Sequence, residues 1–264
     1  MNKIKNRCIM RASSRLFLVI IAALLFSFTS CDDDDGYSLN DFVVRLATVK
    51  IDNGVSYILT DSYTTLLPIA GYYPSTNLAD GDRIAINYTL LYDDFQGFDH
   101  AIKVNNLYKL LSKPIETIET EADDDKYGDD VVWIFDAWVG GDYLNIKFAY
   151  PAFAISKPQH RISLVQNKLV EQEQDGYIHL EYRYNAMGDF DKPLEDTYML
   201  LSYVGFNLKS IEIPDDCKGF KVKINSVKNG HRVLTYDFND TEDKSIDFVE
   251  NEKASQEEAT SKAY

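Results

Sequence analysis

A strand pattern occupies the run Phe42-Val43-Val44-Arg45-Leu46-Ala47-Thr48-Val49-Lys50-Ile51. The run is rich in apolar and β-branched residues, which favour a strand that buries one face. It ends at Asp52-Asn53-Gly54, and Asn-Gly is a preferred pair in the two-residue type I′ hairpin turn. We therefore expect residues 55–60 to return as the paired strand.

Three more strands are expected before the pattern changes, over residues 64–70, 83–92 and 100–111. A long loop through Pro74 and Asp80-Gly81-Asp82 separates the third strand from the fourth. This spacing is typical of a small Greek-key barrel of the OB type, and an open sandwich is the alternative. We predict an OB-like β-barrel domain over residues 37–118.

The strand pattern stops at an acidic stretch that ends in Asp123-Asp124-Asp125-Lys126-Tyr127-Gly128-Asp129-Asp130. Carboxylates in this number can hold calcium, but the stretch lacks the alternate-position acids and the terminal Glu of an EF-hand loop. We predict that residues 119–130 are an acidic, solvated linker between two domains.

Strand patterns resume at residue 131, and seven are expected over residues 131–139, 143–150, 160–166, 177–184, 197–206, 220–226 and 232–238. Loops with Pro, Gly and Asp separate them, which is typical of an antiparallel β-sandwich of immunoglobulin-like size. The fold class predicted is thus all-β, with the sandwich domain over residues 131–240. Residues 208–217 are compatible with a helical turn, and residues 241–264 are expected to be a polar, disordered tail.

The first thirty residues have the form of an export signal. Thirteen uncharged residues, 16–28, follow five basic residues and are too few to span a bilayer as a helix. Cys31 comes directly after Thr29 and Ser30, which is the arrangement of a lipobox, although Phe28 stands where Leu is usual. We predict a signal peptide over residues 1–30, a lipidated Cys31 and an acidic tether over residues 31–36. An ordinary secretory signal is the alternative.

The chain is strongly acidic, with a formal net charge of -15. Removal of residues 1–30, which carry five positive charges and no negative ones, brings the net charge to -20. Because phosphate contacts need clustered Lys and Arg, nucleic acid is not an expected partner. Cys217 would be the one unmodified cysteine of the mature chain, so no disulfide is expected within it.

No motif in the sequence specifies catalysis. The four histidines lie on separate expected segments without metal-ligand spacing, namely His100, His160, His179 and His231. There is no serine-nucleophile elbow, phosphate-binding glycine loop or H-E-x-x-H motif. Carboxylates flank Cys217, which disfavours a reactive thiolate. We predict a protein that is not an enzyme, with no catalytic residue, metal site or cofactor.

Aromatic residues are the most suggestive feature for binding, with 18 Tyr and 14 Phe. Tyr72 and Tyr73 stand together on an expected loop between Gly71 and Pro74, and we take them as candidate ligand-binding residues. OB folds bind oligosaccharides on one barrel face and its loops. Core packing is the alternative for most aromatic residues here, including Tyr182 and Tyr184.

Six short motifs in order resemble the NigD-like lipoprotein family, and they are residues 31–39, 46–49, 81–89, 104–107, 138–145 and 204–208. The resemblance implies an N-terminal OB-like domain followed by a C-terminal β-sandwich domain. This chain departs from the family pattern at Gly205 and Asn207, where Ser and Asp are expected. The family has no known active site, and its name comes from a genetic association with bacteriocin production.

The acidic run directly after the lipid site resembles the signal that sends lipoproteins to the cell surface in the Gram-negative group with such proteins. It consists of Asp32, Asp33, Asp34 and Asp35. We expect a lipid-anchored outer-membrane protein exposed at the cell surface, with a periplasm-facing tether as the alternative. The expected function is binding of a protein or glycan partner. A carbohydrate-binding or carbohydrate-processing accessory protein and a bacteriocin-associated protein are the alternatives.

Overall fold

The structure of the chain is a computed structural model that describes residues 41–73, 77–153, 160–188 and 197–238. The described residues all belong to one compact unit. The predicted signal peptide, the lipid site Cys31, the acidic run 32–35 and the tail 241–264 lie outside them. Within these described ranges, no helix is long and apolar enough to cross a membrane.

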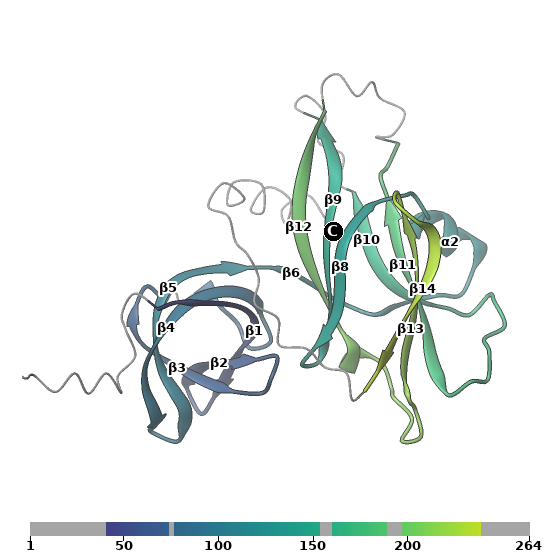
Figure 1. Cartoon of the computed structure of the whole chain (residues 1–264). Helices are drawn as coiled ribbons and strands as arrows, with labels where there is room; N and C mark the ends of the chain where they lie inside the picture. Colours follow the sequence, from purple (N-terminus) through teal and green to yellow (C-terminus); the bar gives the residue numbers. More distant parts are fainter. Residues whose placement is uncertain (1–40, 74–76, 154–159, 189–196, 239–264) are drawn as a thin grey trace, which may run out of the picture. The chain divides into compact units, whose positions relative to one another are not determined.

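The first five strands close into a barrel, as Figure 1 shows: β1 (Val43–Asp52), β2 (Val55–Thr60), β3 (Thr65–Gly71), β4 (Arg83–Phe95) and β5 (Phe98–Lys109). Their order around the barrel is β1-β2-β3-β5-β4, with β1 also paired to β4. The β1–β2 turn has φ of 50° at Asn53 and 82° at Gly54, as a type I′ turn requires. The predicted barrel is therefore confirmed.

Inward-facing aliphatic side chains fill the barrel, and the most deeply buried are Ala47, Val49, Ile58, Ile84, Ile86 and Ile102. Each is removed from water by strands that alternate between the two faces of the sheet. Burial of this apolar surface is the main source of the barrel's stability.

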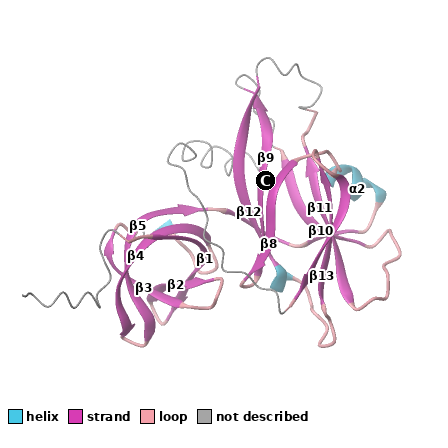
Figure 2. Cartoon of the chain, in the orientation of Figure 1, coloured by secondary structure: helices cyan, strands magenta, loops and turns pink. Residues whose placement is uncertain are grey.

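Two further sheets form the sandwich, and Figure 2 shows that strands dominate it. One sheet has the order β14-β13-β11-β10-β7, and the other has the order β6-β12-β9-β8. The strands are β6 (Leu111–Pro114), β7 (Glu116–Ile118), β8 (Trp133–Gly140), β9 (Tyr143–Phe153), β10 (Arg161–Asn167), β11 (Tyr177–Asn185), β12 (Thr197–Asn207), β13 (Gly219–Ser226) and β14 (Gly230–Asp237). A 3-10 turn, η5 (Leu208–Ser210), follows β12, inside the range where a helical turn was expected.

The sandwich is confirmed, but its pairing is mixed rather than antiparallel throughout. β7 pairs parallel with β10, β13 pairs parallel with β11, and β6 pairs parallel with β12. The first two strands of the domain, β6 and β7, are short, and each joins one of the two sheets beside a later strand that runs in the same direction. Alternation of apolar residues does not encode this direction, because both pairings place side chains on alternate faces.

The domain boundary lies earlier in the chain than we predicted. β6 and β7 fall within the predicted barrel domain, 37–118, but both pair with sandwich strands. The predicted linker, 119–130, contains a helix, α2 (Glu121–Tyr127), which packs on β7, β10 and β11. Thr120 caps this helix in a reciprocal capping box with Asp123. The acidic residues at its first turn therefore stabilise the helix end as well as facing water.

Candidate functional site

The predicted pair Tyr72 and Tyr73 divides into two different environments. The Tyr73 hydroxyl lies 2.7 Å from the Ser56 hydroxyl, and its ring packs against the barrel core. Burial raises the pKa of Tyr73. Tyr72 is 72% exposed, and its backbone N–H donates to the Val104 carbonyl. Tyr73 is thus part of the packing, and Tyr72 is the member of the pair whose ring is open to a ligand.

A row of four aromatic rings lies on the barrel, on β2 and at the tip of the β4–β5 hairpin. Tyr57 lies 5.2 Å from Phe98 between ring centroids, and Tyr92 stacks on Phe95 at 5.8 Å. Phe95 and Phe98 are register partners on the paired strands. Because partners in an antiparallel pair share a face, Phe95 and Phe98 lie on one face of the hairpin, and each belongs to one of the two ring pairs. We call these residues the aromatic row.

The turn of the β4–β5 hairpin fixes the positions of Phe95 and Phe98 in the aromatic row. Gln96 and Gly97 join the strands with φ of 53° and 87°, the signs that a type I′ turn needs at both central residues. This tight turn places Phe95 and Phe98 opposite each other. Tyr92 is 58% exposed, whereas the other three rings are half-buried. The sequence carried a signal for this site in Phe95-Gln96-Gly97-Phe98, which has turn residues between two aromatic residues.

Arg83 joins the barrel to the sandwich. Its guanidinium donates to the Asp61 carboxylate at 2.6 Å and to the Asn145 side-chain oxygen of β9 at 2.9 Å. Its Cζ lies 4.7 Å from the centre of the Tyr143 ring. Arg83 and Asp61 are 1% and 3% exposed. The guanidinium is thus fully neutralised and hydrogen-bonded, as a buried charge must be.

Gly205 lies against this junction. A Cβ at position 205 would come within 3.2 Å of Cγ of Arg83 and 3.3 Å of Cδ1 of Tyr143. The Ser that the family pattern predicts here would crowd both side chains. Leu46 and Ala85 of the barrel pack beside it against Leu110, Trp138 and Tyr203. A side chain at position 205 would therefore require Arg83 and Tyr143 to shift by a few tenths of an ångström.

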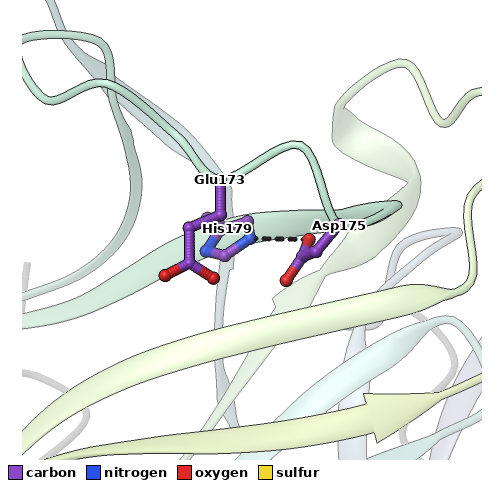
Figure 3. A group of neighbouring side chains, drawn as sticks. All are labelled: Glu173, Asp175 and His179. Atoms are coloured by element: carbon purple, nitrogen blue, oxygen red, sulfur yellow. Dashed lines mark hydrogen bonds and ion pairs between the residues drawn. The ribbon is translucent and has the colours of Figure 1, made fainter.

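Two acidic side chains and one histidine gather on β11 and the loop before it, as Figure 3 shows: Glu173, Asp175 and His179. Their ligand atoms lie within 4.8 Å of one another, and Nε2 of His179 lies 3.0 Å from Asp175. Sequence reasoning missed this group because β11 and the loop before it bring the residues together. Glu173 and His179 line a hollow of about 510 Å³ together with Tyr177 and Cys217.

Lys221 of β13 already supplies a cation to this group. Its ammonium binds the Asp175 carboxylate and lies 3.8 Å from Glu173. Hydrogen bonds from Lys221 and then His179 hold the pKa of Asp175 well below its usual range. A metal ion would have to displace Lys221, so the group fits an ion-pair network. The predictions of no metal site and no catalytic residue stay predictions.

Other residues considered in the sequence lie in structural positions. Tyr182 and Tyr184 are buried in the sandwich core, which agrees with the alternative that they pack in a core. The Tyr184 hydroxyl lies 2.6 Å from Nδ1 of His160. Cys217 is half-buried, and its thiol donates to the Gly219 carbonyl. The Tyr184 hydroxyl and the Cys217 thiol are thus engaged in hydrogen bonds within the fold. The aromatic row is therefore the candidate binding surface that the described residues offer.

Two family models match this chain in order. The NigD-like N-terminal OB domain matches residues 46–110, and the NigD-like C-terminal beta sandwich domain matches residues 114–239. The first match runs from β1 to the end of β5, and the second begins at the last residue of β6. A search among curated proteins gave no match.

Several solved structures have a similar fold. A protein of unknown function from Bacteroides vulgatus ATCC 8482 is 25% identical, with a TM-score of 0.69, over 82% of this chain and 100% of that chain. A protein described as toxin-related, from Parabacteroides distasonis ATCC 8503, is 29% identical, with a TM-score of 0.59, over 75% and 93%.

A third structure, described as a lipoprotein, is from Bacteroides fragilis NCTC 9343. It is 11% identical, with a TM-score of 0.53, over 75% of this chain and 98% of that chain, and it supports the fold alone. The resemblance found in the six sequence motifs is confirmed by the two models, which match the barrel and the sandwich in turn. This chain belongs to the NigD-like family.

Proposed function

We propose that this NigD-like protein is a non-enzymatic, lipid-anchored protein of the outer membrane whose barrel binds a glycan or protein partner. The aromatic row carries the proposal. OB folds bind ligands on the face of strands 2 and 3 and on the loops that join strands 1–2 and 4–5. The row occupies β2, through Tyr57, and the β4–β5 tip, through Phe95 and Phe98.

A glycan is the partner that this surface favours. Aromatic rings present rigid apolar faces at low entropy cost, and such faces can stack on sugar rings. Carboxylates of the same hairpin, such as Asp93 and Asp99, can accept hydrogen bonds from sugar hydroxyls. The negative charge of the chain disfavours nucleic acid. A carbohydrate-binding accessory role is thus the first form of the proposal, and a protein partner is the second.

Membrane attachment through Cys31 is supported by the sequence pattern around it, with a basic segment, a short apolar segment and small residues before the cysteine. A diacylglycerol thioether with an added acyl chain would hold the protein far better than a single chain. Asp32 to Asp35 would direct it to the cell surface. The tether facing the periplasm is the competing location.

A role in bacteriocin production or immunity is a second candidate. It rests on the family name and on the 29% identical structure described as toxin-related. Deletion of the gene should then change toxin output or sensitivity of the host strain. An unchanged phenotype in both assays would remove this candidate.

Binding to a glycan array tests the first candidate. The full chain, purified in detergent, is compared with Tyr92→Ala and with Phe135→Ala, whose ring is 62% exposed on the sandwich. Tyr92 is 58% exposed, so the two substitutions remove similar exposed rings. We expect glycan binding by the wild type and by Phe135→Ala, and its loss in Tyr92→Ala. A blank array with the wild type would refute glycan binding.

A further inference from the structure

Tyr63 is held in a backbone conformation that large side chains rarely adopt. It lies in the turn between β2 and β3 with φ of 64°. The Tyr63 N–H donates to the Thr60 carbonyl, and the Thr64 N–H donates to the Thr60 hydroxyl. Gly or Asn is the usual residue at such a position. Tyr63 is thus a backbone outlier, and such outliers cluster at functional sites. This is a reason to look for a function at its ring.

The Tyr63 ring lies at the border of two hollows. One, of about 310 Å³, is lined by residues of both domains, including Lys50, Asp61, Asp80, Asp142, Tyr143 and Lys209. The other, of about 610 Å³, is lined by Ser62, Thr64, Asp93, Asp94, Asp99 and His100 of the barrel. Tyr63 lines both and is 53% exposed. We call them the junction hollow and the barrel hollow.

The Tyr63 hydroxyl links the turn to the sandwich. It donates to the Asp142 carboxylate at 3.2 Å, and Lys209 binds the same carboxylate at 2.8 Å. Partial burial, with the negative charge of Asp142 beside it, raises the pKa of Tyr63. The ring is thus fixed at its tip, while a large part of its surface stays open to solvent. A fixed, exposed aromatic ring between two polar hollows is suited to stacking against a flat or ring-shaped ligand.

The charges of the hollows indicate which ligand fits. In the junction hollow, Lys50 and Lys209 stand beside three aspartates, and Arg83 neutralises Asp61. These charges nearly cancel. The barrel hollow has three aspartates and one histidine, so it repels anions. Hydroxyl groups and carboxylates in both hollows offer hydrogen-bonding partners without favouring an anionic ligand.

We propose that the two hollows are adjacent subsites for one neutral, hydroxyl-rich oligosaccharide, with Tyr63 as the ring on which a sugar unit stacks between them. This inference rests on the proposed glycan-binding function and gives it a site and a ligand class. Asp93 and His100 of the barrel hollow are on the same hairpin as the aromatic row. The oligosaccharide thus contacts the hairpin at one end and both domains at the other.

Substitution of Tyr63 tests the site without endangering the fold. Tyr63→Gly removes the ring and relieves the strain at this φ, which offsets the loss of the bond to Asp142 and the larger entropy of the unfolded chain, so the melting temperature should change little. Tyr63→Phe keeps the ring and loses the bond to Asp142. The measurement is titration of the full chain in detergent with neutral oligosaccharides selected on the array and with uronic-acid oligosaccharides of equal length.

We expect Tyr63→Gly to raise the Kd for the neutral oligosaccharide about tenfold, and Tyr63→Phe to stay near the wild type. Uronic-acid oligosaccharides should bind much more weakly. Binding by the wild type that Tyr92→Ala weakens but Tyr63→Gly does not would overturn the two-hollow site and leave the proposed function standing. Equal binding of acidic and neutral oligosaccharides would overturn the ligand class. No binding by the wild type would overturn both.

Discussion

The guanidinium of Arg83 lies 2.6 Å from the Asp61 carboxylate, and both side chains are almost fully buried. Removal of one member of such a pair leaves the other charge buried without compensation, which costs about 3–5 kcal/mol. We therefore predict that Arg83→Met lowers the free energy of unfolding by about this amount, as measured by urea denaturation.

The double variant Arg83→Met/Asp61→Leu should regain much of that loss, because no uncompensated charge remains. Lys168 and Glu119 give the matched control, since this pair is 61% and 64% exposed. Lys168→Met should leave the urea midpoint almost unchanged. An Arg83→Met variant as stable as Lys168→Met would contradict the role of Arg83 at the junction.

We predict that substitution of Tyr by Phe has opposite effects on stability at two buried positions of β11. The Tyr182 hydroxyl is buried and has no hydrogen-bond partner among the described residues, whereas the Tyr184 hydroxyl bonds His160. An unsatisfied buried hydroxyl costs stability, and a satisfied one contributes about 1 kcal/mol. Thermal unfolding should thus show Tyr182→Phe to be at least as stable as the wild type and Tyr184→Phe to be less stable. The reverse order would contradict these assignments.

We predict that the Asp175 carboxylate contributes to the loss of folding stability in acid. Lys221 and His179 lower its pKa in the folded state. A carboxyl group whose pKa is lower in the folded state than in the unfolded state stabilises the fold. This contribution is fully present above the unfolded-state pKa of about 3.9, and it is lost as the pH falls through the folded-state pKa. Urea unfolding should show a constant stability difference between wild type and Asp175→Asn above about pH 5, which shrinks as the pH falls below about 4. A difference that does not depend on pH would contradict the ion-pair network.

At the scale of the element, the β4–β5 hairpin determines how the aromatic row is presented. Its turn has Gln96 where the β1–β2 turn has Asn53, and both residues have positive φ. Asn adopts this region more readily than Gln, so Gln96→Asn should stabilise the barrel by about 0.5 kcal/mol. Chemical denaturation measures the gain, with Asn53→Gln as the inverse control. Equal stability of both variants and the wild type would show that the turns do not limit the barrel.

Most strands could be predicted because alternation and turn residues are local signals. β1 to β5 fall close to the expected ranges, and Asn53-Gly54 makes the expected turn. β6 and β7 were missed because four and three residues are too few to show a period. α2 was read as a linker because its acidic residues also suit solvent. Its capping residue Thr120 is the signal that could have identified it.

The candidate site was less predictable than the fold. Tyr72 and Tyr73 are adjacent in sequence, yet Tyr73 turns toward Ser56 and joins the core. The aromatic row depends on the strand register, and the junction hollow beside Tyr63 depends on contacts between the two domains. A positive φ at Tyr63 has no sequence signal, because tyrosine is not a turn residue that favours it. Tertiary contacts therefore specify the site.

At the scale of the whole molecule, we propose that the N-terminal segment determines where the domains act. Cys31→Ser should leave an uncleaved or soluble protein, because the sulfur that would carry lipid is lost. Replacement of Asp32 to Asp35 by Ala should keep the lipid and remove exposure to protease added to intact cells. Membrane fractionation and surface proteolysis measure these outcomes. Unchanged surface proteolysis after the four replacements would mean that the acidic run is only a tether.

The central claim is that the two domains form a binding protein that does not process its ligand. The most direct measurement incubates the detergent-purified full chain with a labelled neutral oligosaccharide, follows binding at equilibrium and then analyses the recovered sugar by mass spectrometry. We predict saturable binding, with the oligosaccharide recovered intact after prolonged incubation. No binding, or recovery of shorter or modified products, would contradict the account.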